Sequence, residues 1–260
     1  MSEDIFLQRE GAVAELVLNR PAKRNAITSA MWLAIPDLLE TVAADAGVKL
    51  LIVRGAGGSF AAGADIAEFE AVYATRQRAE AYTRSIGAAL DSLAAFPKPT
   101  LARIEGVCVG GGCGVALSCD LRFAARGSRF AITPAKLGLT YTLNDTKRLI
   151  DAVGVSYAKD ILYSGRMLDA EEAFRIGLIN RLVDAEALAQ TVAEYAAGLS
   201  ATSAYSARIS KKIISMIRAG VDADTEETRQ MFLDAFQGED FQEGYRAFLE
   251  KRPPQFPGQS

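Results

Sequence analysis

Histidine is absent from the sequence. Its absence excludes Ser-His-Asp and Cys-His nucleophile pairs, and it excludes zinc or haem sites that depend on imidazole ligands. Any acid–base chemistry must therefore use a carboxylate, a tyrosine, a lysine, a thiol or water. We expect no metal site in this chain.

Cysteine is scarce, and long apolar runs are missing. The three cysteines, Cys108, Cys113 and Cys119, fall within one apolar segment, and an odd, clustered set argues against a disulfide framework. It favours a reducing compartment, so we expect a cytoplasmic protein. No apolar run reaches the roughly 18 residues that span a bilayer, and the acidic N-terminus, residues 1–4, is unlike a signal peptide.

Charge of one sign is not in large excess either. The net charge is −3, and no predicted helix carries a dense basic stripe. We therefore expect neither nucleic acid nor an anionic membrane as a partner.

Strand-like and helical segments alternate along most of the 260 residues, half of which are apolar. The strand-like runs are 13–18, 50–54, 100–104, 121–124 and 177–183, and helical patterns lie between them, among them 146–153, 156–162 and 170–175. Thr28 or Ser29 can cap the first helix, which follows the first of these strand-like runs. This order predicts a mostly parallel sheet in an α/β fold. From Ala185 onward the pattern is helical only. We therefore predict a core over residues 1–185 and a C-terminal helical region over residues 186–260 that serves assembly.

Two loops are rich in small residues. The stretch 105–120 follows the strand-like run 100–104 and leads through Gly110, Gly111 and Gly112 into a helix, so the backbone there can approach a ligand and direct unpaired N–H groups at negative charge. The alternative is that these glycines only let a buried helix pack tightly on a strand. A second small-residue loop, 60–66, favours the ligand interpretation.

These loops and other motifs together resemble the enoyl-CoA hydratase/isomerase (crotonase) superfamily over nearly the whole chain. The matching segments are 19–21, 25–26, 60–66, 97–99, 106–113, 118–120, 136–138, 164–165, 169–173, 177–178 and 248–252. The resemblance implies a crotonase-like spiral of ββα units, a C-terminal helical trimerisation region, and a homotrimer or homohexamer. It also implies an acyl-CoA thioester substrate that carries its own coenzyme A, with no separate cofactor.

The resemblance further implies a catalytic strategy. The thioester oxygen would lie between the backbone N–H groups of Ala64 and Gly111. Preorganised donors of this kind stabilise an enolate, and losing one typically costs about 10²–10³ in rate. The small side chains at both positions agree with a need for backbone access.

A set of positions would contact coenzyme A if the resemblance holds. They are Lys23 and Arg24 in the loop beside the nucleotide, Ala62, Asp65 and Ile66 on the adenine side, and Phe248 and Lys251, a C-terminal pair that reaches a coenzyme A site, sometimes in a neighbouring subunit, and closes it. Cations near an anionic nucleotide are physically reasonable on an acidic protein. From the residues alone, however, ordinary solvated surface charges are the favoured interpretation of these cations, and only the resemblance favours contact with coenzyme A.

Three positions of the substrate pocket depart from the family pattern. Where hydratases of the family carry two glutamates, this sequence has Gly114 and Pro134, and neither residue can transfer a proton. A third position, aspartate in some isomerases and dehalogenases, is Thr142. The sequence therefore supports neither two-glutamate hydration nor isomerisation by the second glutamate.

Segment 133–141 resembles that of methylmalonyl-CoA decarboxylases, in which a tyrosine lies in the pocket, and Glu105 also matches them. Decarboxylation needs no base, because loss of CO₂ generates the enolate, and the hydroxyl of Tyr141 could orient a carboxylate or protonate that enolate. The alternative is a hydroxyl bonded to the backbone. Against the decarboxylase, Ala64 and Gly114 stand where those enzymes carry histidine and glutamate.

Further polar residues near these motifs have structural explanations. Asp145, Glu68 and Glu70 could reach the acyl pocket, but we expect Asp145 to cap the following helix and the two glutamates to lie on a solvated helix face. We expect Cys113 to be buried by packing. The leading prediction is thus an acyl-CoA enzyme of the hydratase/isomerase superfamily that acts through an enolate with non-standard proton-transfer groups. A decarboxylase of a malonyl-type CoA thioester and a catalytically silent acyl-CoA-binding homologue are the alternatives.

Overall fold

The computed structural model describes residues 3–256. Its larger sheet has the strand order β1-β2-β3-β4-β6-β9. These strands are β1 (Ile5–Glu10), β2 (Val13–Leu18), β3 (Leu50–Gly55), β4 (Thr100–Ile104), β6 (Leu121–Ala125) and β9 (Arg181–Val183). Only β1 and β2 pair antiparallel in it, and the other neighbours are parallel. The predicted α/β fold with a mostly parallel sheet is confirmed.

A smaller sheet has the order β5-β7-β8. Its strands are β5 (Val107–Val109), β7 (Arg129–Ala131) and β8 (Leu168–Asp169). All three are too short to show an alternation of side chains in the sequence, and the sequence analysis did not predict them. The strand–turn–helix predicted around the glycines therefore has β5 inserted between β4 and the helix.

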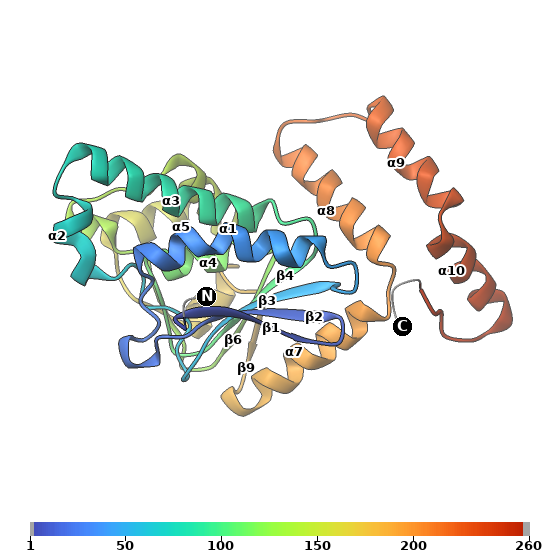
Figure 1. Cartoon of the computed structure of the whole chain (residues 1–260), viewed down its shortest axis with the longest axis horizontal. Helices are drawn as coiled ribbons and strands as arrows, with labels where there is room; N and C mark the ends of the chain where they lie inside the picture. Colours follow the sequence, from blue (N-terminus) through green and yellow to red (C-terminus); the bar gives the residue numbers. More distant parts are fainter. Residues whose placement is uncertain (1–2, 257–260) are drawn as a thin grey trace.

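Helices cover both faces of the larger sheet, as Figure 1 shows. On one face lie α1 (Ser29–Ala44), α3 (Arg76–Ala94) and α4 (Gly111–Ser118), and on the other lies α7 (Ala185–Ser200). Leu51 and Val53 of β3 point to the first group, whereas Leu50 and Ile52 point to α7. Burial on both faces explains why β3 is a continuous apolar run in the sequence.

Local signals position the helix boundaries. The hydroxyl of Thr28 caps α1 by accepting from the N–H of Met31 at 3.3 Å, as the sequence predicts for Thr28 or Ser29. The remaining helices of the body are α2 (Phe69–Val72), α5 (Leu143–Ser164) and α6 (Ala170–Arg175). Helix α5 kinks at Gly154, whose φ is +74°, between its two predicted halves. The strand predicted over 177–183 begins only at Arg181, because Gly177 starts a turn with φ +84°.

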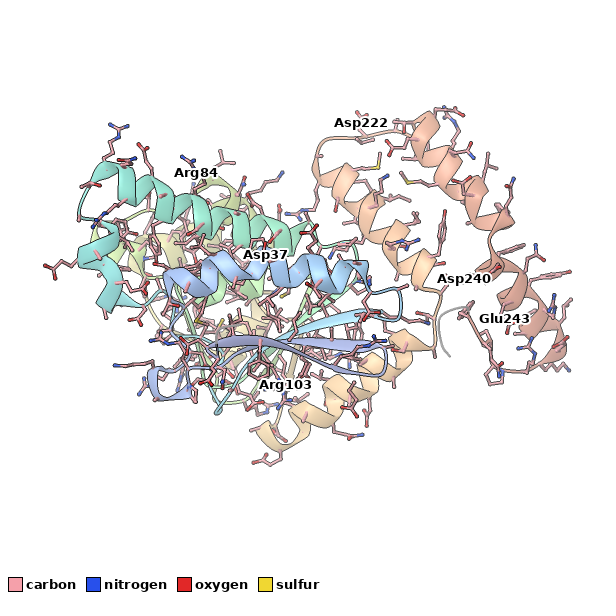
Figure 2. All side chains as sticks on the ribbon, in the orientation of Figure 1. Asp37, Arg84, Arg103, Asp222, Asp240 and Glu243 are labelled. Carbon is pink, nitrogen blue, oxygen red and sulfur yellow. The ribbon has the colours of Figure 1, made fainter. Side chains whose placement is uncertain are left out.

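The C-terminal arm, residues 204–250, leaves the body (Figure 1). It consists of α8 (Ala204–Arg218), α9 (Glu226–Gln237) and α10 (Glu239–Glu250). Figure 2 labels Asp240 near the start of α10, where its carboxylate accepts a hydrogen bond from Ser203 just before α8. Helix α7 begins at the predicted core boundary but packs on the sheet through Leu188, Val192 and Ala196, so the arm itself starts after it.

Across residues 3–256, no helix combines the length and the apolar character that crossing a membrane requires.

Candidate functional site

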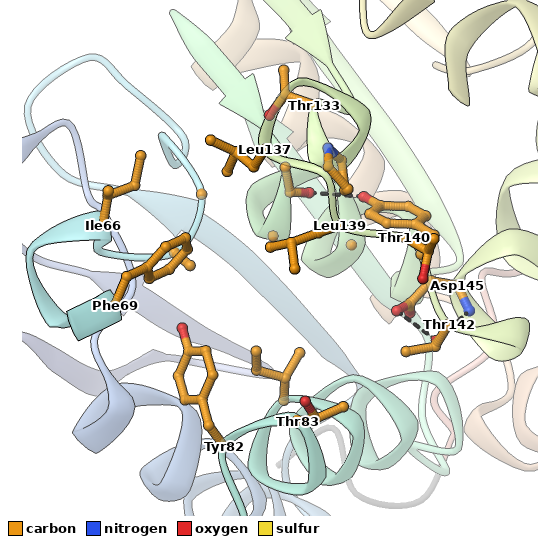
Figure 3. A pocket seen from close by; sticks show the side chains of 18 of the residues that line it. Ile66, Phe69, Tyr82, Thr83, Thr133, Leu137, Leu139, Thr140, Thr142 and Asp145 are labelled. Atoms are coloured by element: carbon orange, nitrogen blue, oxygen red, sulfur yellow. Dashed lines mark hydrogen bonds between the residues drawn. The ribbon is translucent and has the colours of Figure 1, made fainter. Parts of the chain in front are cut away.

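A cavity of about 190 Å³ lies between the loop after β3, helices α1 and α3, and segment 133–145 (Figure 3). Its walls are mainly apolar. The large apolar side chains that line it are Ile66, Phe69, Ile86, Leu90, Leu137 and Leu139. Such a partly open apolar site with a few polar groups is the usual form of a small-molecule pocket.

The backbones of Ala64 and Gly111 meet at this cavity. A methyl group added to Gly111 would lie 3.5 Å from the nitrogen of Ala64, and one added to Gly63 would lie 3.5 Å from the nitrogen of Gly111. Gly111 is the first residue of α4, so its N–H has no partner inside the helix. Neither N–H donates a hydrogen bond within the part of the chain that the structure describes. Two free donors therefore lie side by side at the cavity wall.

The hydrogen bonds around Ala64 explain why its N–H stays free. The N–H of Ile27 donates to the carbonyl of Gly63 at 2.7 Å, and the N–H of Asp65 donates to the carbonyl of Ile27 at 2.9 Å. This parallel bridge uses the groups on either side of the Ala64 nitrogen and leaves that nitrogen turned away. The bridge also fixes the loop onto the chain that leads into α1.

The three adjacent glycines have different structural reasons. Gly110 has a φ of +53°, which side chains rarely tolerate. A methyl at Gly111 would lie 3.0 Å from Cζ2 of Trp32 and would press on the indole at the cavity. A methyl at Gly112 would lie 2.5 Å from the carbonyl oxygen of Ala61. The tight-packing interpretation thus applies to Gly112, and the open-backbone interpretation applies to Gly111.

The hydroxyl of Tyr141 donates to the carbonyl oxygen of Gly110 at 2.9 Å. This confirms the alternative in which the hydroxyl bonds to the backbone. The carbonyl belongs to the same peptide group as the N–H of Gly111, so the bond orients and polarises that donor. Burial raises the pKa of Tyr141 well above its usual value, which keeps the hydroxyl protonated.

Gly114, Pro134 and Thr142, the three positions at which the sequence predicts a departure from the family pattern, all line the cavity. Asp145 lines it as well and is 8% exposed. The expectation that Asp145 caps α5 is wrong. Thr142 is the cap, and its hydroxyl accepts from the N–H of Asp145 at 3.2 Å and donates to the carboxylate at 2.8 Å. Aspartate and threonine are both good caps, so residue type alone did not distinguish them.

The electrostatics of the cavity follow from this lining. Among the described residues that line it, Asp145 is the only carboxylate, and none is lysine or arginine. Arg148 donates to Asp145 at 2.9 Å from outside the lining, so the carboxylate is paired. The cavity therefore has one compensated negative group and no cation facing the ligand.

Lys23 and Arg24 are exposed in the loop beside the cavity mouth. The N–H of Ala62, which lines the cavity, donates to the carbonyl of Arg24 at 2.9 Å. Within residues 3–256 neither cationic side chain makes a hydrogen bond or an ion pair. Buried Asn25 holds this loop by donating to the carbonyls of Ala56 at 2.9 Å and Ser59 at 2.6 Å.

Asp65 and Ile66 follow the free N–H of Ala64. The carboxylate of Asp65 accepts from Arg20 at 2.8 Å and from the N–H of Ala67 at 3.1 Å, and the bond from Arg20 lowers its pKa. It thereby caps the 3₁₀ helix η2 (Ile66–Glu68). Ile66 is 64% exposed and lines the cavity.

Phe248 and Lys251 lie on the arm. Phe248 is 81% exposed on α10, and Lys251 ends that helix. In Figure 1 α10 is at the opposite end of the molecule from α2 and α3, so the chain does not bring these residues to its own cavity. A contact with coenzyme A would need a second copy.

Sequence reasoning missed three polar aromatic residues of the cavity wall, Trp32, Tyr73 and Tyr82. Tyr82 belongs to the apolar stripe of α3, so its pattern looked like core packing only. Glu68 was also misjudged: its carboxylate accepts from the N–H and the hydroxyl of Ser29, both at 2.7 Å, at the start of α1. Cys113 is buried, with its Sγ 2.9 Å from the carbonyl oxygen of Cys108, as predicted.

Comparison with known proteins identifies the family. The model of the family described as "Enoyl-CoA hydratase/isomerase" matches residues 8–259. The chain belongs to this family. It is 36% identical over 263 residues to the crotonyl-CoA hydratase of Syntrophomonas wolfei, covering 98% of each chain. It is 32% identical over 251 residues to the short-chain-enoyl-CoA hydratase of Clostridium acetobutylicum, covering 96% of this chain and 95% of that one.

Solved structures of the family share the fold. A crystal structure of an enoyl-CoA hydratase/isomerase family protein from Hyphomonas neptunium superposes with a TM-score of 0.95 at 46% identity, over 97% of each chain. The crotonase-like fold and the C-terminal helices expected from the resemblance are therefore confirmed.

Proposed function

We propose that the protein binds an acyl-CoA thioester and stabilises its enolate with the N–H groups of Ala64 and Gly111. The observation that carries this proposal is the pair of adjacent, unbonded N–H groups at an otherwise apolar cavity. Negative charge develops on the thioester oxygen as an enolate forms. Donors already fixed in a water-poor site stabilise that charge without reorganisation.

The exposed cations beside the cavity support the placement of coenzyme A. Its phosphates would lie against Lys23 and Arg24, whose side chains make no hydrogen bond or ion pair within the described residues. Ala62 and Ile66 would contact the adenine side, whereas Asp65 acts through its bond to Arg20. The acyl group would enter the cavity past Leu137 and Leu139.

The reaction proposed is of the hydratase or isomerase type, in keeping with the names of the relatives. Gly114 and Pro134 cannot transfer a proton, so the two-glutamate route is not available to this chain. Asp145 is the carboxylate that remains at the cavity, and we assign proton transfer to it or to water. Tyr141 serves as a positioning residue for the Gly110–Gly111 peptide rather than as a proton donor.

The decarboxylase alternative receives less support. A malonyl-type thioester carries a carboxylate, and the described lining of the cavity offers it no cation but contains Asp145. Burying an unpaired carboxylate there would be strongly unfavourable. The hydroxyl of Tyr141, which would have oriented that carboxylate, already donates to Gly110.

We also propose that copies of the chain assemble through the arm as a homotrimer or homohexamer. The arm exposes large apolar side chains, among them Phe232, Phe236, Phe241, Tyr245 and Phe248. Contiguous exposed apolar surface marks interaction sites. Assembly would also allow Phe248 and Lys251 to close the coenzyme A site of a neighbouring copy.

An assay of three thioesters tests the proposed function. Crotonyl-CoA reports hydration by loss of its absorbance, 3-butenoyl-CoA reports isomerisation, and methylmalonyl-CoA reports CO₂ release. We expect turnover of an enoyl-CoA, and Gly111→Ala should lower it about 10²–10³-fold, because the added methyl lies between Trp32 and the Ala64 nitrogen.

The matched control is Gly87→Ala in α3, where an added methyl meets nothing within 4 Å. Its turnover should equal that of the unchanged protein. Turnover that survives in Gly111→Ala would contradict the assigned donors. Measurable thioester binding without any product would instead identify a catalytically silent homologue.

A further inference from the structure

Two polar atoms of the cavity wall have no hydrogen-bond partner. They are the hydroxyl oxygen of Tyr82 on α3 and Nε1 of Trp32 on α1. No other buried side-chain nitrogen or oxygen atom in residues 3–256 lacks a hydrogen-bond partner. Tyr82 is 5% exposed, and Trp32 is fully buried. Buried polar groups are nearly always paired, so two orphans facing one cavity call for an explanation.

The two atoms lie next to each other. The indole N–H of Trp32 is directed at the hydroxyl oxygen of Tyr82 and interacts with it weakly, which opposes the rise in the pKa of Tyr82, but the contact falls short of a full hydrogen bond. The indole N–H can only donate, so the hydroxyl of Tyr82 is left to donate its own proton elsewhere. Burial raises the pKa of Tyr82 to about 12, so this proton is present at neutral pH.

The pair is near the proposed oxyanion donors. Cζ2 of Trp32 would lie 3.0 Å from a methyl at Gly111, which places the indole directly beside that residue. Figure 3 shows the hydroxyl of Tyr82 directed into the cavity, toward Phe69 and away from the helix that carries it. Around it the wall is apolar, with Phe69, Ile86 and Leu90. A ligand oxygen at this wall would be able to accept a hydrogen bond from these two groups, and few other polar groups are nearby.

The following inference rests on the proposed function. We propose that Tyr82 and Trp32 form an oxygen-recognition site for the acyl group of the substrate, in which Tyr82 donates a hydrogen bond to a neutral hydroxyl or ketone oxygen. A neutral oxygen fits because no described lining residue is cationic and Asp145 is anionic. A site built to bond an oxygen discriminates against the analogue that lacks it, because its buried donor then stays unpaired. The acyl group is therefore an oxygenated chain rather than a plain hydrocarbon.

A purely structural role for Tyr82 makes a different prediction. Its ring packs edge-on against Tyr73, with centroids 5.7 Å apart, and a phenylalanine would make the same contact. Tyr82→Phe therefore removes the hydroxyl while keeping the packing. Tyr73→Phe is the matched control, because Tyr73 lines the same cavity but is 38% exposed and lets water reach its hydroxyl.

Isothermal titration of butanoyl-CoA, 3-hydroxybutanoyl-CoA, 4-hydroxybutanoyl-CoA and 3-oxobutanoyl-CoA tests the inference by affinity, independently of turnover. We expect the unchanged protein to bind at least one oxygenated thioester about tenfold more tightly than butanoyl-CoA. Tyr82→Phe should abolish that preference while leaving butanoyl-CoA affinity unchanged, and Tyr73→Phe should retain it.

Equal affinity for all four thioesters in the unchanged protein, or an unaltered preference in Tyr82→Phe, would overturn the inference alone. Absence of binding by every thioester, butanoyl-CoA included, would overturn the proposed function as well. The two failures are thus distinguishable in one experiment.

Discussion

The body and the C-terminal arm use aromatic residues in opposite ways. The body, residues 3–200, buries Trp32, Phe60 and Phe123 almost completely, whereas Phe232 and Phe248 of the arm are 65% and 81% exposed. Aromatic burial is a main source of folding free energy. The body therefore has its own complete core, whereas the arm leaves large apolar side chains exposed.

The contacts that join the arm to the body also differ from the contacts within the body. The ammonium group of Lys211 in α8 donates to the carbonyl of Lys98 at 2.9 Å and to Asp120 at 2.8 Å, and Arg218 pairs with Asp151. These joins are polar, unlike the apolar packing of α7 on the sheet. The arm is thus a docked element whose large apolar side chains remain available.

The first prediction concerns the exposed aromatic surface of the arm and has the largest expected effect. Phe236→Glu places a charge among the exposed aromatic rings, in which Phe236 makes edge-to-face contacts with Phe232 and Phe241 and Phe241 stacks on Tyr245. Burying that charge in an interface would be so unfavourable that we expect monomers instead of a homotrimer or homohexamer. Sedimentation or light scattering measures the mass.

The control for this prediction is Leu33→Glu, at a side chain of α1 that is 65% exposed on the body. Its assembly should be unchanged. If Phe236→Glu keeps the mass of the unchanged protein, the arm is not the interface.

The second prediction tests the body. Gly112→Ala forces a methyl to within 2.5 Å of the Ala61 carbonyl oxygen, where the close backbone contact joins the two loops of the site. We expect a loss of about 2–3 kcal/mol in the free energy of unfolding, measured by urea denaturation. A stability equal to that of Gly87→Ala would show that the loops can separate at no cost.

The third prediction concerns the role of Tyr141 in the site. Tyr141→Phe removes the bond to the Gly110 carbonyl, so we expect kcat to fall about tenfold with little change in KM. The shape of the pH–rate profile should not change, since a positioning residue does not titrate in the reaction. A lost limb of that profile would instead assign Tyr141 as a proton donor.

The fourth prediction has the smallest effect and concerns pH. The bond from Arg20 lowers the folded-state pKa of Asp65 below 3.8, so the pair adds stability above that pH. The contribution, up to about 1 kcal/mol, is lost as the pH falls through the folded-state pKa. Asp65→Asn should therefore be less stable than the unchanged protein near pH 6 and equal to it in strong acid. A constant difference across pH would contradict this linkage.

Local patterns allowed the larger elements to be predicted, but not the short strands or the cavity contacts. Helix α6 begins and ends where the helical pattern placed it, over 170–175. Strands β5, β7 and β8 have two or three residues each, and their pairing depends on partners distant in the chain. The cap of α5 shows the same limit. Thr142 and Asp145 are both suitable cap residues, and the sequence does not show at which of them the helix begins.

The sequence by itself determined the fold class, the family resemblance and the absence of imidazole chemistry, and it predicts that Gly114 and Pro134 stand at the positions of the two glutamates. These follow from residue type and spacing, which are local properties. Only the tertiary structure decided that Tyr141 bonds the Gly110 carbonyl, that Asp145 reaches the cavity, and that Tyr82 and Trp32 face it unpaired. Each of those outcomes depends on groups from separate elements meeting in space, and no spacing along one segment encodes such a meeting.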